Sequence, residues 1–209
     1  MDYLYELINR YPHLKVIEGD VLKAYNLLTE TFKAKGKLLV AGNGGSAADA
    51  EHIVGELMKG FVKKRPLPNS FTEKLRGINI ERSQYIAENI QQGLPAIALH
   101  AHTALNTACI NDIGGEIIYA QQVYGYGNVG DVFLGISTSG NARNVLYAMI
   151  CARAKDMKTI ALTGGTGGEI VKYADVSIIV PEKETYKIQE LHLPVYHTLC
   201  LMIEEYFFP

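Results

Sequence analysis

The chain has 209 residues, of which 48% are hydrophobic and 20% charged, and its formal net charge at pH 7 is −2. The length suits one α/β domain with a single large core, and the lack of a basic excess argues against a nucleic-acid partner. Three cysteines without paired spacing favour buried thiols over a disulfide framework or a cysteine-based zinc site. The N-terminus lacks a signal-peptide pattern, and no apolar run reaches the ~20 residues of a membrane helix, so we expect a cytoplasmic protein.

Hydrophobic periodicity predicts helices alternating with short apolar strands. In chain order, we expect a helix over 14–35, a strand over 38–41, a helix from 46 to about 61, an extra helix within an insertion at about 67–93, a strand over 95–99, helices ending near 112 and spanning about 116–124, a strand over 131–136, a helix over 142–155, a strand over 158–162, a short helix after 168, a strand over 176–180 and a helix over about 186–206. This alternation predicts an α/β fold, a three-layer doubly wound sandwich with a five-stranded parallel sheet. We expect residues 1–209 to form one domain.

A glycine turn, Gly42–Gly45, follows the first predicted strand, and Ser46 is a suitable N-cap for the helix after it. Glycines let the backbone approach a ligand, and the free N–H groups at a helix start favour an anion such as phosphate. The spacing fits neither a dinucleotide fingerprint nor a P-loop. Taken alone, such a turn is more often structural than functional.

A second turn, Ser137-Thr138-Ser139-Gly140-Asn141, follows the strand over 131–136. Its three hydroxyls and a run of N–H groups suit the outer oxygens of a phosphate monoester, although a hydroxyl-rich N-cap is an alternative interpretation. Ligands of parallel sheets bind beyond the carboxyl ends of the strands. Because both turns should lie at that edge, ligand binding is the better interpretation.

Four polar side chains stand on two of the predicted helices. His52 and Glu56 are four residues apart and share one helix face, a geometry used for metal or acid–base chemistry but also common on solvated helices. His197 lies in the last helix, two turns beyond Gln189, where a buried core histidine is the more frequent case. Pro194 lies between them and predicts a kink or a non-helical turn.

The ordered set of motifs resembles the sugar isomerase (SIS) domain family, and within it the isomerases of sedoheptulose 7-phosphate. The resemblance runs from about residue 14 to the C-terminus. It rests on the following residues: Gly42–Ser46, His52, Glu56, Asn111, Asp112, Gly135–Asn141, Gln189 and His197. Each motif is weak alone, whereas the ordered set at matching spacing is specific. The family's SIS fold agrees with the parallel α/β prediction, and its members assemble as homotetramers with sites between subunits.

The resemblance also implies a role for each matched residue. Substrate would be bound by Asn43, Gly44, Gly45, Ser46, Asn111, Asp112 and Gln189, with Ser137, Thr138 and Ser139 holding the phosphate. One zinc ion per subunit would be held by His52, Glu56, Gln189 and His197. Glu56 and His197 match the family's acid–base pair. The implied reaction converts D-sedoheptulose 7-phosphate to D-glycero-D-manno-heptose 7-phosphate through an enediol, which needs a base near carbon and an acid near oxygen.

Three departures from the family pattern concern the substrate. Ala142 stands where the family has its last phosphate-binding hydroxyl, Tyr186 replaces a frequent aspartate, and the 67–93 insertion is absent from the short bacterial enzymes. The alternatives are therefore an isomerase of another phosphosugar, a phosphosugar-sensing module, or a non-catalytic adaptor that binds the replication initiator. The adaptor lacks the catalytic glutamate and the C-terminal histidine, so Glu56 and His197 favour an enzyme.

Overall fold

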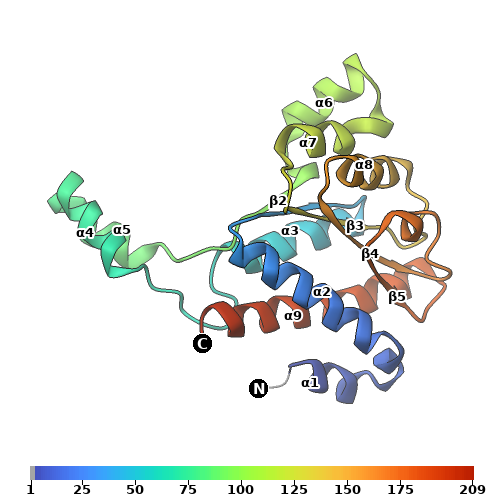
Figure 1. Ribbon diagram of the computed structural model, residues 1–209, viewed down its shortest axis with the longest axis horizontal. Coiled ribbons are helices and arrows are strands. Elements are labelled where there is room, and N and C mark those ends of the chain that lie inside the picture. Colours follow the sequence, from blue (N-terminus) through green and yellow to red (C-terminus); the bar gives the residue numbers. More distant parts are fainter. Residues whose placement is uncertain (1–2) are drawn as a thin grey trace.

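The computed structural model describes residues 3–209, which fold around one parallel sheet covered by helices on both faces (Figure 1). The strands are β1 (Leu38–Ala41), β2 (Ala96–Ala98), β3 (Val132–Ile136), β4 (Lys158–Gly164) and β5 (Val176–Val180). Their order is β2-β1-β3-β4-β5, and every neighbouring pair is parallel. The predicted α/β class and five-stranded parallel sheet are confirmed.

Nine α-helices and four 3₁₀-helices occur in the described residues. The α-helices are α1 (Tyr3–Arg10), α2 (Glu18–Lys33), α3 (Gly45–Met58), α4 (Asn69–Ile78), α5 (Ile80–Asn89), α6 (Thr103–Asp112), α7 (Ile118–Tyr126), α8 (Arg143–Ala154) and α9 (Thr185–Phe207); the 3₁₀-helices are η1 (Pro12–Ile17), η2 (Leu99–Ala101), η3 (Gly115–Ile117) and η4 (Ile170–Tyr173). Within residues 3–209, no helix combines the length and apolar character needed to cross a membrane.

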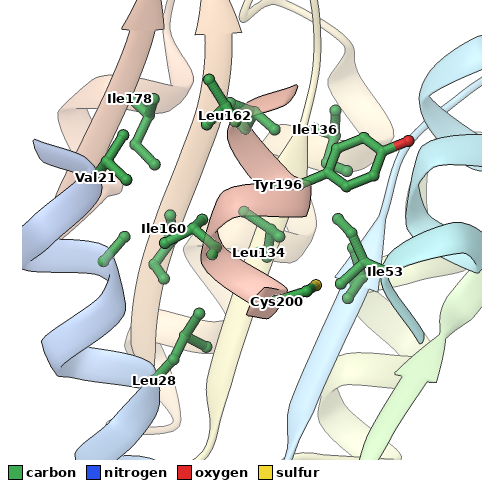
Figure 2. Close-up of a cluster of buried hydrophobic side chains, with 14 of the residues drawn as sticks. Val21, Leu28, Ile53, Leu134, Ile136, Ile160, Leu162, Ile178, Tyr196 and Cys200 are labelled. Atoms are coloured by element: carbon green, nitrogen blue, oxygen red, sulfur yellow. The ribbon is translucent and has the colours of Figure 1, made fainter. Parts of the chain in front are cut away.

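The sheet separates two hydrophobic cores because successive strand side chains point to opposite faces. Leu38 and Val40 pack with α1, α2, α3 and α9, whereas Leu39 and Ala41 pack with α7 and α8. Figure 2 shows the first core, where side chains of α2, α3 and α9 meet those of β3, β4 and β5. The central strands β1 and β3 are buried along their whole length, which is why they read as continuous apolar runs, whereas alternate residues of the edge strand β5 are only partly buried.

The helix expected over 14–35 begins later than predicted. Residues Pro12–Ile17 form the 3₁₀-helix η1, and the α-helix α2 starts at Glu18. Leu14 and Ile17 are both buried, and their spacing of three matches the three residues per turn of a 3₁₀-helix. The same spacing fits an α-helix on paper, so the periodicity did not distinguish the two. Helix α1 was not predicted.

The insertion at 67–93 is helical, but it forms two helices instead of the single one expected. Asn79 ends α4 and caps α5, since its side chain accepts a hydrogen bond from the Arg82 N–H at 2.9 Å. The two helices pack on each other and project from the body as a hairpin, which we call the arm (Figure 1). No residue of α4 is buried, and Ser83 is the one buried residue of α5.

Helix α9 continues through Pro194, so no non-helical turn interrupts it. It carries the fully buried His192 on its core side. Burial lowers the pKa of His192 to about 4, with the nearby Thr163 backbone acting in the opposite direction. The folded protein therefore needs this histidine neutral.

We expect acid to destabilise the fold through His192. Its pKa is lower in the folded state than the ordinary value near 6.5, so its contribution is complete above pH 6.5 and is lost as the pH falls toward 4. Between pH 7 and pH 5, the free energy of unfolding should fall by about 2 kcal/mol from this group. Urea unfolding of wild type and His192→Gln at both pH values measures the effect. An identical pH dependence in both proteins would contradict it.

Candidate active site

The two predicted ligand turns lie side by side at one edge of the sheet. β1 and β3 are neighbours, with Ala41 paired to Gly135, so the turns leave adjacent strand ends. Together with α9 they surround a cavity of about 330 Å³. Its lining residues are Asn43, Gly44, Gly45, Ser46, Ile136, Ser137, Thr138, Ser139, Ala142, Thr185 and Gln189. The sequence therefore placed both turns at the same site correctly.

Two glycines shape the first turn. Gly44 has φ +55°, in the left-handed region that glycine adopts readily. At Gly45, a Cβ would lie 2.6 Å from Nε2 of Gln189, so the Gln189 carboxamide packs directly against this backbone. The prediction of Ser46 as N-cap is wrong: α3 begins at Gly45 with Gly44 as its cap, and Ser46 is buried in the first turn. The glycine conformation turns the chain two residues earlier than a serine cap at Ser46 requires.

The second turn offers hydroxyls that do not serve as a helix cap. Helix α8 begins at Arg143, its N-cap is Ala142, and no side chain caps it. Ser139 Oγ accepts a hydrogen bond from the Asn141 N–H at 3.2 Å, whereas no protein partner for the hydroxyls of Ser137 and Thr138 occurs within residues 3–209. The alternative of a hydroxyl-rich N-cap is therefore excluded. The hydroxyls face a cavity, as a phosphate site requires.

Asn43 is held by the protein. Its carboxamide exchanges two hydrogen bonds with that of Asn144, at 2.8 and 2.9 Å, which joins the first turn to α8. The Tyr119 hydroxyl donates to the Gly42 carbonyl at 2.8 Å and approaches Asn43 Oδ1 at 3.2 Å. These contacts fix the shape of the first turn before any substrate arrives.

His52, Glu56 and His197 converge from two helices. His52 Nε2 lies 3.2 Å from Glu56 Oε1 and 3.4 Å from His197 Nε2. The two imidazole rings meet edge to face, with centroids 4.7 Å apart. His197 also lines a second cavity of about 190 Å³ between α1 and α9. The spacing of four on α3 therefore brings His52 and Glu56 into contact, and His197 is not an enclosed core histidine.

Tyr196 and Asp49 orient His52, and sequence reasoning assigned neither a role. The Tyr196 hydroxyl donates to Asp49 Oδ1 at 3.2 Å and lies 3.1 Å from His52 Nδ1. Because that hydroxyl has one proton, the second contact requires the proton of His52 to sit on Nδ1. Nε2 of His52 then presents a lone pair to Glu56 and His197. Asp49 lies one turn before His52 on α3, and this spacing was a usable signal.

Burial perturbs three groups of this cluster. The pKa of His197 is lowered by burial and by the nearby His52, with Glu56 opposing, which favours the neutral imidazole. Burial raises the pKa of Asp49, opposed by the hydrogen bond from Tyr196. The pKa of Tyr196 is also raised by burial, with Asp49 adding to the shift, so its hydroxyl keeps its proton.

Within one chain, two sets of residues that the resemblance assigned to one site do not lie together. They are the pair Gln189 and His197, and the pair Asn111 and Asp112 relative to the two turns. Gln189 borders the first turn, while His197 borders His52 two turns further along α9. Asn111 and Asp112 are exposed at the end of α6, hydrogen-bonded to each other at 2.8 Å, and line neither cavity. No group of three or more histidine, cysteine, aspartate or glutamate side chains is arranged as a ready metal site in residues 3–209.

Comparisons with known proteins agree on one family. A family model described as SIS domain matches residues 2–93 and 86–164. The phosphoheptose isomerase of Citrifermentans bemidjiense is 40% identical over 185 residues, covering 88% of this chain and 83% of that protein. The phosphoheptose isomerase of Nitratiruptor is 42% identical over 178 residues, covering 85% and 81%. The solved phosphoheptose isomerase of Francisella tularensis has 31% identity and a TM-score of 0.77, covering 97% and 95%.

Proposed function

Because this chain belongs to the SIS domain family, we propose that it is a phosphoheptose isomerase, which converts D-sedoheptulose 7-phosphate to D-glycero-D-manno-heptose 7-phosphate. The observation that carries the proposal is the convergence of Glu56 and His197 at one end of a path whose other end is the hydroxyl-rich turn. The similarity to named phosphoheptose isomerases supports a phosphosugar-isomerising enzyme over a non-catalytic adaptor.

Helices α3 and α9 define that path. Gly45 adjoins Gln189 and His52 adjoins His197, so the two helices run side by side in the same direction. At 1.5 Å per residue, His52 stands about 10 Å and Glu56 about 16 Å along α3 from Gly45. Side chains on a helix lean toward its N-terminus, which shortens both distances. An extended seven-carbon phosphosugar has a comparable length, so its phosphate and its C1–C2 end can be held at the same time.

The proposed reaction is a pair of proton transfers. The Glu56 carboxylate removes a proton from C1 of the ketose, which gives the enediol, and returns it to C2. His197 takes a proton from O1 and gives one to O2, so the substrate gains and loses none overall. The lowered pKa of His197 favours the neutral imidazole that accepts a proton. The alternative assignment exchanges the roles of the two residues.

Two donor separations in this cluster suit a zinc ion, although the side chains do not form a ready metal site before the ion binds. Two ligands about 2.0–2.1 Å from a tetrahedral zinc stand about 3.4 Å apart, close to the His52–His197 and His52–Glu56 separations of 3.4 and 3.2 Å. The Asp49–Tyr196 contact leaves the His52 lone pair aimed at this point, as outer hydrogen bonds to metal-binding histidines do. We therefore propose zinc held by His52, Glu56 and His197, with Gln189 approaching from the first turn. Bound zinc would act as a Lewis acid toward the substrate oxygens.

Zinc is expected in the purified protein, and His52→Ala is expected to lose it. Removing this nitrogen ligand leaves Glu56 and His197, with Gln189 as a weak neutral donor, and this set should not retain the ion through dialysis. Metal analysis by mass spectrometry of the untreated proteins gives the measurement. His100→Ala serves as the matched control because His100 pairs with Glu51 away from the cluster. Stoichiometric metal in His52→Ala would exclude this ligand set.

An assay of ketose phosphate isomerisation tests the proposed function directly. Purified protein is incubated with sedoheptulose 7-phosphate, with and without added zinc, and the aldose product is followed by NMR. Fructose 6-phosphate and ribulose 5-phosphate test isomerases of other phosphosugars. Conversion of the heptose is the expected result, and no turnover of any ketose phosphate would overturn the enzyme assignment.

For assembly, the proposal is a homotetramer with sites at subunit interfaces. The arm supports it, since Ile78 and Ile80 are 83% and 79% exposed at its tip and two helices of ten residues bury too little apolar surface to be stable alone. For location, the proposal is the cytoplasm, in keeping with the three free cysteines of the described chain.

Charges at the tip of the arm are expected to break the assembly. Ile78→Asp combined with Ile80→Asp places two carboxylates where an interface would bury isoleucine, which is strongly unfavourable. Light scattering after size exclusion should report a species smaller than the wild-type tetramer. Val129→Asp, at a site 77% exposed in a turn of the body, is the matched control. A double variant of unchanged mass would contradict an interface at the arm.

A further inference from the structure

A buried ion pair outside the proton-transfer cluster joins the ends of the two helices that carry it. Arg65 follows α3 and Glu204 lies in the last two turns of α9, and both side chains are buried. Arg65 Nε donates to Glu204 Oε1 at 2.9 Å, and Nη2 lies 2.8 Å from the same oxygen. A buried charge pair of this kind is stable only when its remaining donors and acceptors are also satisfied.

The other N–H groups of the Arg65 guanidinium donate hydrogen bonds to the C-terminal end of α3. Nη1 donates to the Leu57 carbonyl at 2.7 Å, and Nη2 donates to the Glu56 carbonyl at 2.9 Å. These are among the last carbonyls of the helix, which have no partner within it. The guanidinium therefore caps the C-terminal end of α3 and binds the backbone carbonyl of Glu56, the residue proposed as the base.

Glu204 binds the backbone of the loop that follows α3. Its carboxylate accepts hydrogen bonds from the backbone N–H groups of Phe61, Val62 and Lys63, at 2.8, 2.9 and 3.2 Å. Burial raises the pKa of this carboxyl, but the Val62 and Phe61 amides and Arg65 lower it by more. The net shift is downward, so the ionised form prevails. The Phe61 ring in turn packs on His197, with centroids 5.3 Å apart.

We propose that Arg65 and Glu204 are positioning residues that hold Glu56 and His197 at their working separation. The pair links α3 to α9. Arg65 holds the Glu56 backbone through its carbonyl, and Glu204 holds the Phe61 backbone, which positions the Phe61 ring against His197. Neither side chain lines the cavity at the two turns or the cavity between α1 and α9. The inference rests on the proposed isomerase function for its catalytic consequence, whereas the link between the helices stands on the contacts alone.

The test compares Arg65→Lys with the wild type in kcat, KM and melting temperature. Lysine keeps the charge but cannot reach Glu204, Leu57 and Glu56 together, because it has one ammonium in place of a planar fork. We expect kcat per folded molecule to fall about tenfold to a hundredfold, the scale of a misplacement of about 1 Å. KM should stay within about twofold because the phosphate turn is unchanged.

Two controls separate positioning from general destabilisation. Arg153→Lys changes an exposed ion pair with Asp175 and should leave both constants unchanged. Met149→Ala opens a cavity in the core on the other sheet face, so it should lower the melting temperature without changing kcat of the folded enzyme. A kcat for folded Arg65→Lys within twofold of wild type would overturn the proposal.

Hydrogen exchange provides a readout that needs no substrate. The amides of Phe61, Val62 and Lys63 should exchange slowly in the wild type and faster in Arg65→Lys, with no change in Arg153→Lys. Glu204→Gln, which keeps the side-chain shape, replaces Arg65→Lys if that variant does not fold. Fast exchange of these amides in the wild type would overturn the link between the helices. A wild type that is inactive on every ketose phosphate but protected here would overturn the isomerase assignment and leave the link supported.

Discussion

Glu56→Gln is expected to lower kcat for heptose phosphate isomerisation by roughly two to four powers of ten, the range that general acid–base residues contribute. The amide keeps the size of the carboxylate but cannot take a proton from C1. Its contacts with His52 and Lys59, both at 3.2 Å, come from the same helix end and should hold the new side chain in place. KM should change little because the phosphate turn is untouched.

Glu51→Gln is the matched control for Glu56→Gln. Glu51 lies on the same helix, carries an exposed carboxylate and pairs with His100 at 3.2 Å. It should isomerise the substrate at the wild-type rate. Solvent deuterium entering C1 of recovered ketose measures proton removal directly. A Glu56→Gln enzyme that exchanges this hydrogen at the normal rate would remove Glu56 from the role of base.

His197→Asn is expected to reduce kcat by a similar factor, because asparagine can form hydrogen bonds to O1 and O2 but cannot transfer a proton between them. Rate measurements should be made alongside zinc analysis, since His197 is also a proposed ligand. A variant that keeps zinc yet loses turnover supports proton transfer.

The exposed His13 provides the control for His197→Asn. His13→Asn should retain full activity because His13 lies near α1 and outside the cluster. If His197→Asn turns over at close to the wild-type rate, His197 has no part in proton transfer.

The strands could be predicted closely because each is a short, mainly apolar run ended by a glycine or polar turn. β1 and β5 have the predicted bounds, and β4 extends two residues further. Helix starts were harder, since a spacing of three or four apolar residues fits both a 3₁₀-helix and an α-helix. At residues 12–17 the 3₁₀ form prevailed, with Pro12 at its start.

The cluster of His52, Glu56 and His197 was accessible only through the resemblance, because nothing local in the sequence reports that α3 and α9 lie side by side. Tyr196 escaped notice for the same reason, since its partner Asp49 is 147 residues away. The arm gave a local signal at Asn79, a residue favoured as N-cap, that would have divided one predicted helix into two. The arm projects because its two helices do not pack on the body of the protein. A local sequence pattern does not report such a lack of long-range contacts.

The base of the arm shows how such an addition can be tolerated. The chain leaves and returns at one place, where Gln91 Oε1 accepts from the N–H groups of Gly60 and Arg65 at 3.2 Å, and Gln92 N donates to the Arg65 carbonyl at 2.8 Å. Leu94 N then donates to the Leu57 carbonyl at 2.9 Å. Whatever lies beyond this junction is topologically a side branch, so a change in its length alters the surface offered for assembly without displacing the strands of the sheet.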